Sequence, residues 1–144
     1  MYDKYFTATY QDGARGEVVG GRYLLDCWGL VLAIREEVLG LPALPAFGPI
    51  DRRDLRSSAK AYAQYAELMP EGPPVPGAIA AVLHGGLCIH VGVVVPIDGE
   101  LRVFEIDAVA GVDNMRLIDF ERSYPRVKYH RDRDLSEQAG RRAC

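Results

Sequence analysis

The sequence predicts an α+β fold in which helices come first along the chain and short strands follow them. Three observations lead to this prediction. Residues 26–39 have the pattern of a buried helix, and residues 52–69 have apolar positions at helical spacing. Residues 78–131 then break into short apolar segments separated by turn residues. Helices followed by a run of strands are typical of helices packed on an antiparallel sheet.

The chain has 144 residues, of which 49% are apolar and 26% charged, and this size suits one domain. We assign residues 1–131 to that domain. Residues 132–144 are charged and lack an apolar period, so we expect them to form a mobile tail.

Composition excludes several classes of protein. The formal net charge of -3 gives no basic patch for nucleic acid, and no apolar run approaches the length of about 18 residues that a membrane span needs. The polar, aromatic start does not resemble a secretory signal, so we expect synthesis in the cytoplasm without one. Three cysteines without a CxxC pair argue against a disulfide framework or a structural zinc site, and we expect no metal or cofactor.

The N-terminal half contains the predicted helices. Residues 1–25 are predicted to form turns rather than a helix, because glycines interrupt them. For residues 26–39, Asp26 is a good N-cap, Gly40 is a good stop, and the first two turns are apolar nearly all round. A helix that is apolar on every side is buried in the middle of a fold.

The remaining elements are predicted from the positions of turn residues and from the spacing of apolar residues. Residues 41–50 hold three prolines and a glycine and are predicted to form a loop, and residues 52–69 an amphipathic helix that ends at a Pro-Gly-rich run. The predicted strands are residues 78–83, 88–95, 101–106, 114–119 and 126–131, with turns at His84-Gly85-Gly86, Pro96-Ile97-Asp98-Gly99 and Gly111-Val112-Asp113.

Cys27 is the candidate nucleophile because it directly follows the predicted N-cap of the buried helix. A thiol attacks as the thiolate, and the positive end of a helix favours an anion. The unpaired N–H groups of the first turn could also hold the oxyanion of a tetrahedral intermediate. A cysteine on an apolar helix is also a common core residue, and that interpretation fits Cys88 as well.

A thiolate of this kind needs a base, and His90 is the candidate. His84 lies in a glycine turn and His130 near the tail, whereas His90 lies inside a predicted strand. At a period of two, His90 shares a face with Cys88, Gly92 and Val94, and Gly92 leaves room for another element to approach.

A third group usually orients the base. Glu105 and Asp107 share one face of the next predicted strand, and a carboxylate there could fix the imidazole tautomer. Glu105 is the first choice and Asp107 the fallback.

Two motifs resemble those of the NlpC-type cysteine peptidases. Asp26-Cys27-Trp28-Gly29-Leu30-Val31 is similar to the nucleophile motif of this family, and Pro76-Gly77 followed by His90-Val91-Gly92-Val93-Val94 is similar to its second motif. The resemblance implies a papain-like fold, in which an N-terminal buried helix carrying the cysteine packs on an antiparallel sheet. It also implies a thiol protease that acts on the peptide stems of peptidoglycan.

The phage-tail branch of the family is the closer resemblance. Trp28 after the cysteine, Val38-Leu39-Gly40-Leu41-Pro42, and Tyr10-Gln11-Asp12-Gly13-Ala14-Arg15-Gly16 are similar to segments of that branch. The resemblance places an upstream tyrosine near the oxyanion, here Tyr10 or alternatively Tyr23. We assign Asp26 and Trp28 to the oxyanion or substrate region as well, although Trp28 fits a core position better than a substrate platform. It implies a virion component that contacts other tail-tip proteins. The third catalytic position is usually His in the family, so Glu105 is a departure.

Three functions therefore compete. The first is a phage-tail cell-wall endopeptidase, a hydrolase that uses Cys27, His90 and Glu105. The second is a structural tail-tip assembly or plug protein with little or no hydrolysis. The third is a thiol amidase or acyltransferase of similar fold, because a Cys/His pair alone does not select the acyl acceptor.

Overall fold

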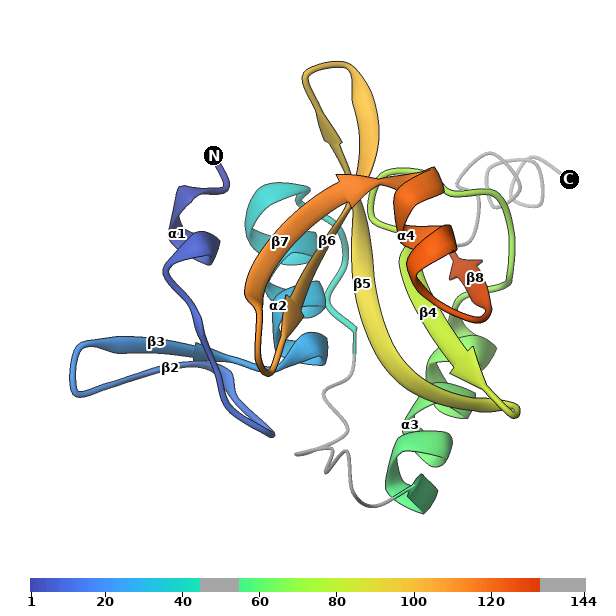
Figure 1. Cartoon of the computed structure of the whole chain (residues 1–144), viewed down its shortest axis with the longest axis horizontal. Helices are drawn as coiled ribbons and strands as arrows, with labels where there is room; N and C mark the ends of the chain where they lie inside the picture. Colours follow the sequence, from blue (N-terminus) through green and yellow to red (C-terminus); the bar gives the residue numbers. More distant parts are fainter. Residues whose placement is uncertain (45–54, 133–144) are drawn as a thin grey trace, which may run out of the picture.

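The computed structural model describes residues 1–44 and 55–132. Two sheets and a few helices form a mixed α+β fold, which confirms the predicted class (Figure 1). Most of the predicted loop at 41–50, the first residues of the predicted helix at 52–69 and nearly all of the predicted tail at 132–144 lie outside the described residues.

The elements in chain order are α1 (Asp3–Phe6), β1 (Thr9–Tyr10), β2 (Arg15–Val19), β3 (Arg22–Leu25), α2 (Cys27–Ala33), the π-helix η1 (Ile34–Val38), α3 (Leu55–Leu68), β4 (Ile79–His84), β5 (Leu87–Ile97), β6 (Glu100–Asp107), β7 (Gly111–Arg116), α4 (Leu117–Ser123) and β8 (Val127–His130).

The larger sheet has five strands in the order β7-β6-β5-β4-β8, and every neighbouring pair is antiparallel, as predicted. The smaller sheet has the order β1-β3-β2 and includes a parallel pair, β1 with β3. The prediction of turns alone for residues 1–25 was therefore wrong. Gly20 and Gly21 do form a turn, with φ of 58° and 77°, but this turn joins the paired strands β2 and β3.

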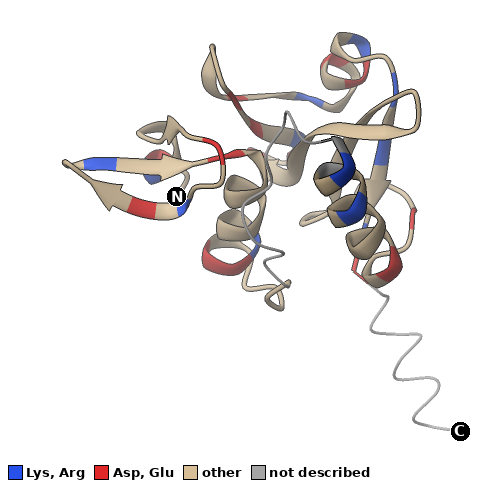
Figure 2. Ribbon diagram, turned by 90° about the horizontal axis from the view of Figure 1, so that it is seen from below, with Lys and Arg blue, Asp and Glu red and all other residues tan. Residues whose placement is uncertain are grey.

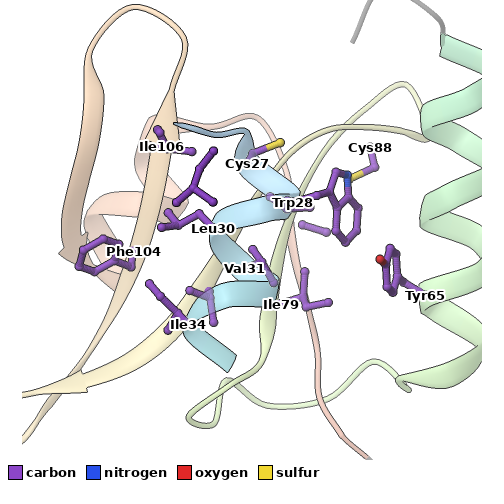
Figure 3. Close-up of a cluster of buried hydrophobic side chains, with 14 of the residues drawn as sticks. Cys27, Trp28, Leu30, Val31, Ile34, Tyr65, Ile79, Cys88, Phe104 and Ile106 are labelled. Atoms are coloured by element: carbon purple, nitrogen blue, oxygen red, sulfur yellow. The ribbon is translucent and has the colours of Figure 1, made fainter. Parts of the chain in front are cut away.

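The predicted helix at 26–39 is confirmed, and it changes from an α-helix to a π-helix at Ile34. α2 begins at Cys27 behind the N-cap Asp26 and continues into η1, and Gly40 follows with a φ of 63°. Leu30, Val31 and Ile34 are fully buried. α2 packs on β5 and β6, with its apolar side chains pointing toward both strands and toward α3 (Figure 3).

α3 lies beside α2, and both helices pack on β5. The Trp28 indole stacks on the Tyr65 ring with 4.4 Å between ring centroids (Figure 3). The buried stripe of α3 runs through Ala61, Tyr65 and Met69, one position away from the predicted stripe at Leu55, Ala59, Tyr62, Ala66 and Met69, of which only Met69 is buried among the described side chains. α2 is thus enclosed by the sheet, by α3 through Trp28 and by β2, which is why it has no polar face in its first two turns.

Four of the five predicted strands lie within a few residues of β4, β5, β6 and β8. The predicted strand at 114–119 was wrong in its second half, because the chain turns into α4 at Leu117, and the predicted turn at 111–113 lies inside β7. The helix inserts the fully buried Phe120 into a second apolar cluster on the sheet face opposite α2. Side chains of β5 alternate between the clusters, with Val93 facing α2 and Val94 facing Phe120.

Charged residues of both signs are spread along the ribbon, and α3 carries both (Figure 2). This agrees with the small net charge of -3. None of the helices in the described ranges is long and apolar enough to cross a membrane.

One charge is fully buried. The guanidinium of Arg35 in η1 donates to Gly77 O at 2.7 Å and to both carboxylate oxygens of Asp132 at 2.9 and 2.7 Å. These bonds join η1 to the turn before β4 and to the residue that ends the described chain after β8. The ion pair therefore fastens the helical layer to the sheet.

We predict that Asp132→Ala destabilises the fold, because it leaves the Arg35 guanidinium buried without a counter-charge. The expected loss is on the order of 2–3 kcal/mol, below the range for a fully buried pair because the Asp132 side chain is partly exposed. Urea unfolding measures it. Asp119→Ala is the matched control, since Asp119 pairs with Arg116 at the surface and its loss should leave the midpoint nearly unchanged. Equal midpoints for both variants would contradict the prediction.

Candidate active site

The thiol of Cys27 lies at the first turn of the buried helix α2 (Figure 3). Cys27 is 6% exposed, so the thiol is largely shielded from solvent. The helix supplies no acceptor for the N–H groups of its first turn, and their dipoles point toward the N-terminus where the sulfur lies. The position therefore favours a negative charge on sulfur and on any oxygen bound beside it.

Asp26 fixes this end of the helix. Its Oδ1 accepts from Gly29 N at 2.7 Å and from Arg15 Nη1 at 2.6 Å, and its Oδ2 accepts from Gly13 N at 3.0 Å. The carboxylate is nearly fully buried. A Cβ on Gly29 would collide with the carbonyl oxygen of Ala14. The loop before β2 is thus clamped onto the first turn of α2, and Asp26 acts as a structural anchor beside the nucleophile.

His90 on β5 faces Cys27. The two side chains interact, and His90 Nε2 lies 3.6 Å from Glu105 Oε1, with no hydrogen-bond partner among the described residues. Burial by itself lowers the pKa of His90, but the neighbouring Cys27 and Glu105 outweigh it and raise the pKa to about 9. The imidazole is therefore held in the protonated form at neutral pH, beside a sulfur that can carry the opposite charge.

Glu105, not Asp107, faces His90. Glu105 on β6 is 4% exposed, and its Oε1 accepts from the Tyr124 hydroxyl at 2.7 Å. Asp107 lies two residues on, and its Oδ2 accepts from Val109 N and Ala110 N at 2.8 Å each, which caps the turn between β6 and β7. Of the two carboxylates that the sequence left open, Glu105 is thus the one beside His90, and its catalytic role stays a prediction.

The pairing of β5 with β6 ends next to this site. Its register runs from Ile97↔Glu100 to Val93↔Phe104, so Glu105 lies one residue and His90 three residues beyond the last pair. Gly92 lies between them, and a Cβ there would come within 2.6 Å of the Val103 side chain. The room that Gly92 was predicted to leave is thus filled by β6 itself.

Cys88 does not share the face of His90, contrary to the prediction from a period of two. Val82 pairs with His90 and Leu83 pairs with Cys88, so Ile89 is an extra residue in a β-bulge. The bulge turns Cys88 into the cluster under α2. Burial, and to a smaller extent the neighbouring Cys27, raise the pKa of Cys88 to about 12, so this thiol stays protonated. Cys144 lies outside the described residues.

The aromatic residues assigned to the site lie around it. The Trp28 indole points away from Cys27 into the contact with α3 (Figure 3). The Tyr10 hydroxyl donates to Asp12 Oδ1 at 2.8 Å, while its ring packs against the cluster that contains Cys27. Tyr23 packs near Lys4 and Tyr5. Tyr23 packs against the same cluster, so these contacts do not select between Tyr10 and Tyr23, and the tyrosine near the oxyanion stays a prediction.

The other histidines have different surroundings. His84 is exposed at the end of β4. His130 is buried, with Nδ1 3.0 Å from Met69 O and Nε2 2.7 Å from the Tyr62 hydroxyl, and so fastens α3 to β8. Of the three histidines, His90 is thus the one paired with a thiol.

A cavity of about 340 Å³ lies on the opposite side of α2. Gly29 and Ala33 line it, and Gly29 is turned by roughly 200° around the helix from Cys27. The cavity is therefore separate from the thiol and the imidazole.

Two residues of the site were missed by sequence reasoning. Tyr124 follows α4, and Arg15 begins β2, and each reaches the site only through the tertiary fold. Tyr124 has no sequence pattern that marks it. Arg15 lies in the segment Tyr10–Gly16 that resembles the phage-tail branch, but that resemblance assigns it no role.

We predict that Asp26→Ala lowers the free energy of unfolding by about 2 kcal/mol, at the upper end for loss of a helix cap, because Arg15 and two backbone N–H groups lose their acceptor. Asp26→Asn keeps an acceptor for the cap and should lose less. Urea unfolding of the two variants tests the order. Equal losses would mean that the charge, not the cap, holds the helix end.

No protein-family model matches this chain, and no curated protein does. A function therefore rests on the geometry of Cys27, His90 and Glu105 and on the two sequence motifs.

Proposed function

We propose that this chain is a cysteine hydrolase of papain-like fold, with Cys27 as nucleophile, His90 as general acid and base, and Glu105 as the group that orients His90. The observation that carries the proposal is the convergence of these three side chains from α2, β5 and β6 at the start of a buried helix. Such a thiol has two independent sources of activation, the helix terminus and the imidazolium.

The proposed reaction is acyl transfer through the sulfur. The Cys27 thiol gives its proton to His90, and the thiolate attacks an amide carbonyl to form a tetrahedral oxyanion beside the N–H groups of the first turn of α2. His90 then returns the proton to the leaving amine as the C–N bond breaks. Water, deprotonated by His90, hydrolyses the thioester and restores the thiol. General acid–base transfer of this kind contributes about 10² to 10⁴-fold in rate.

The proposed substrate is the stem peptide of bacterial peptidoglycan, cleaved at a phage tail tip. The two motifs around Cys27 and His90 support it through their resemblance to the NlpC-type family. An amidase or acyltransferase would use the same pair with another substrate or acceptor, and a panel of wall fragments and small amides distinguishes these activities.

A structural tail-tip protein is the second candidate. Two observations favour it: Cys27 and His90 are only 6% and 7% exposed, and Val18 and Val19 are exposed on the hairpin of β2 and β3. A component of this kind would bind tail partners through such apolar side chains and would not need the thiol. Phage carrying Cys27→Ala would then remain infectious.

We predict that iodoacetamide alkylates Cys27 at neutral pH faster than Cys88, and that His90→Ala slows the alkylation of Cys27. Mass spectrometry of the Cys27 peptide separates it from Cys88 and Cys144.

Cys27→Ala should abolish lysis of purified wall and leave the circular dichroism spectrum unchanged. A folded Cys27→Ala variant that lyses wall at the same rate would falsify the proposal, and Cys88→Ala is the control that should keep activity.

We predict that wall hydrolysis falls as pH rises through about 9. The pKa of His90 is raised to about 9, so the imidazole is protonated below that pH and loses its proton above it. The leaving amine then has no acid to protonate it. Alkylation of Cys27 needs only the thiolate and should stay fast above pH 9, and circular dichroism checks that the protein remains folded. A midpoint near the ordinary imidazole value of 6.5 would contradict the raised pKa.

A further inference from the structure

The Glu105 carboxylate is buried and is held mainly through one oxygen. Oε1 accepts from the Tyr124 hydroxyl at 2.7 Å and lies 3.6 Å from His90 Nε2. Among the described residues, Oε2 has no hydrogen-bond partner. The orientation of a buried carboxylate with this pattern depends on the single strong donor that fixes Oε1, which is the Tyr124 hydroxyl.

Tyr124 is itself placed by packing. It is the C-cap of α4, with an extended backbone, and its ring lies 4.8 Å from that of the fully buried Phe120. The same ring lies 5.6 Å from the His90 ring, tilted by 37°. α4 therefore carries a hydroxyl to the back of the His90–Glu105 pair, on the sheet face opposite α2.

We propose that Tyr124 is a positioning residue, whose hydroxyl holds Glu105 Oε1 toward His90 and so stabilises the His90 imidazolium and the Cys27 thiolate. This inference rests on the proposed function of Cys27 and His90. Without the hydroxyl, the carboxylate can rotate about its side-chain bonds and no longer directs its charge at the imidazole. The effect reaches the thiol only through Glu105 and His90.

The test is the pH dependence of Cys27 alkylation by iodoacetamide in a Cys144→Ser background, read on the Cys27 peptide by mass spectrometry. Tyr124→Phe removes the hydroxyl and keeps the ring. We expect the apparent pKa of Cys27 to rise by about one unit, which is the scale of one hydrogen bond to a charged group. The rate at neutral pH should fall by up to about tenfold as the thiolate fraction falls.

Tyr129→Phe is the matched control. The Tyr129 hydroxyl donates to Glu121 Oε1 at 2.8 Å, and Tyr129 belongs to the same apolar cluster against which Tyr124 packs. This variant removes an equivalent tyrosine–glutamate bond, so a general loss of stability should appear in both variants. Only Tyr124→Phe should move the alkylation profile.

Glu105→Gln provides the second test. If Tyr124 acts through the carboxylate, adding Tyr124→Phe to Glu105→Gln should shift the profile no further. A further shift in the double variant, an unchanged or lowered pKa in Tyr124→Phe, or an equal shift in Tyr129→Phe overturns the inference. If Glu105→Gln does not fold, the comparison of Tyr124→Phe with Tyr129→Phe decides.

The wild-type profile separates this inference from the proposed function. A wild-type thiol with an ordinary pKa that His90→Ala does not change overturns both. An activated wild-type thiol with an unchanged Tyr124→Phe variant overturns only the role of Tyr124.

Discussion

The capping of α2 by Asp26 is the interaction on which the rest of the site depends. The carboxylate satisfies the Gly29 N–H, pairs with Arg15 and accepts from Gly13 N, so the helix start and the preceding loop form one unit. Cys27 is the next residue, so the cap fixes its position. Since the helix is packed against the sheet, α3 and β2, the thiol cannot move without disturbing the core. The nucleophile is therefore set by the same contacts that stabilise the domain.

The second constraint is the end of the pairing between β5 and β6. The last pair is Val93↔Phe104, and Gly92, the next residue of β5, lets β6 approach closely there. Beyond the last strand pair, His90 and Glu105 face each other, and both side chains are nearly fully buried. Charges interact more strongly there than in water, and an unpaired charge is costly, so the thiol, imidazole and carboxylate are coupled tightly.

The two faces of the larger sheet contribute different side chains to the site. α2 supplies the thiol and the larger cluster from one face, while α4 supplies Phe120 and Tyr124 from the other. The bulge at Ile89 belongs to the same arrangement, because it turns Cys88 into the core and leaves His90 on the face of α4. The two thiols thereby have different chemistry, since Cys88 is protonated by burial whereas Cys27 lies beside an imidazolium.

The sequence by itself determined the local features whose cause is local. The N-cap Asp26, the buried helix with Cys27, its end before Gly40 and the strand with His90 all follow from residue type and period. Tertiary structure decided what depends on pairing and packing. The helix α4 forms because Phe120 fills the second cluster, Glu105 rather than Asp107 faces His90 because Asp107 caps a turn, and Arg35 is buried because Asp132 folds back onto it. These contacts join residues distant in the chain, whose proximity no local pattern encodes.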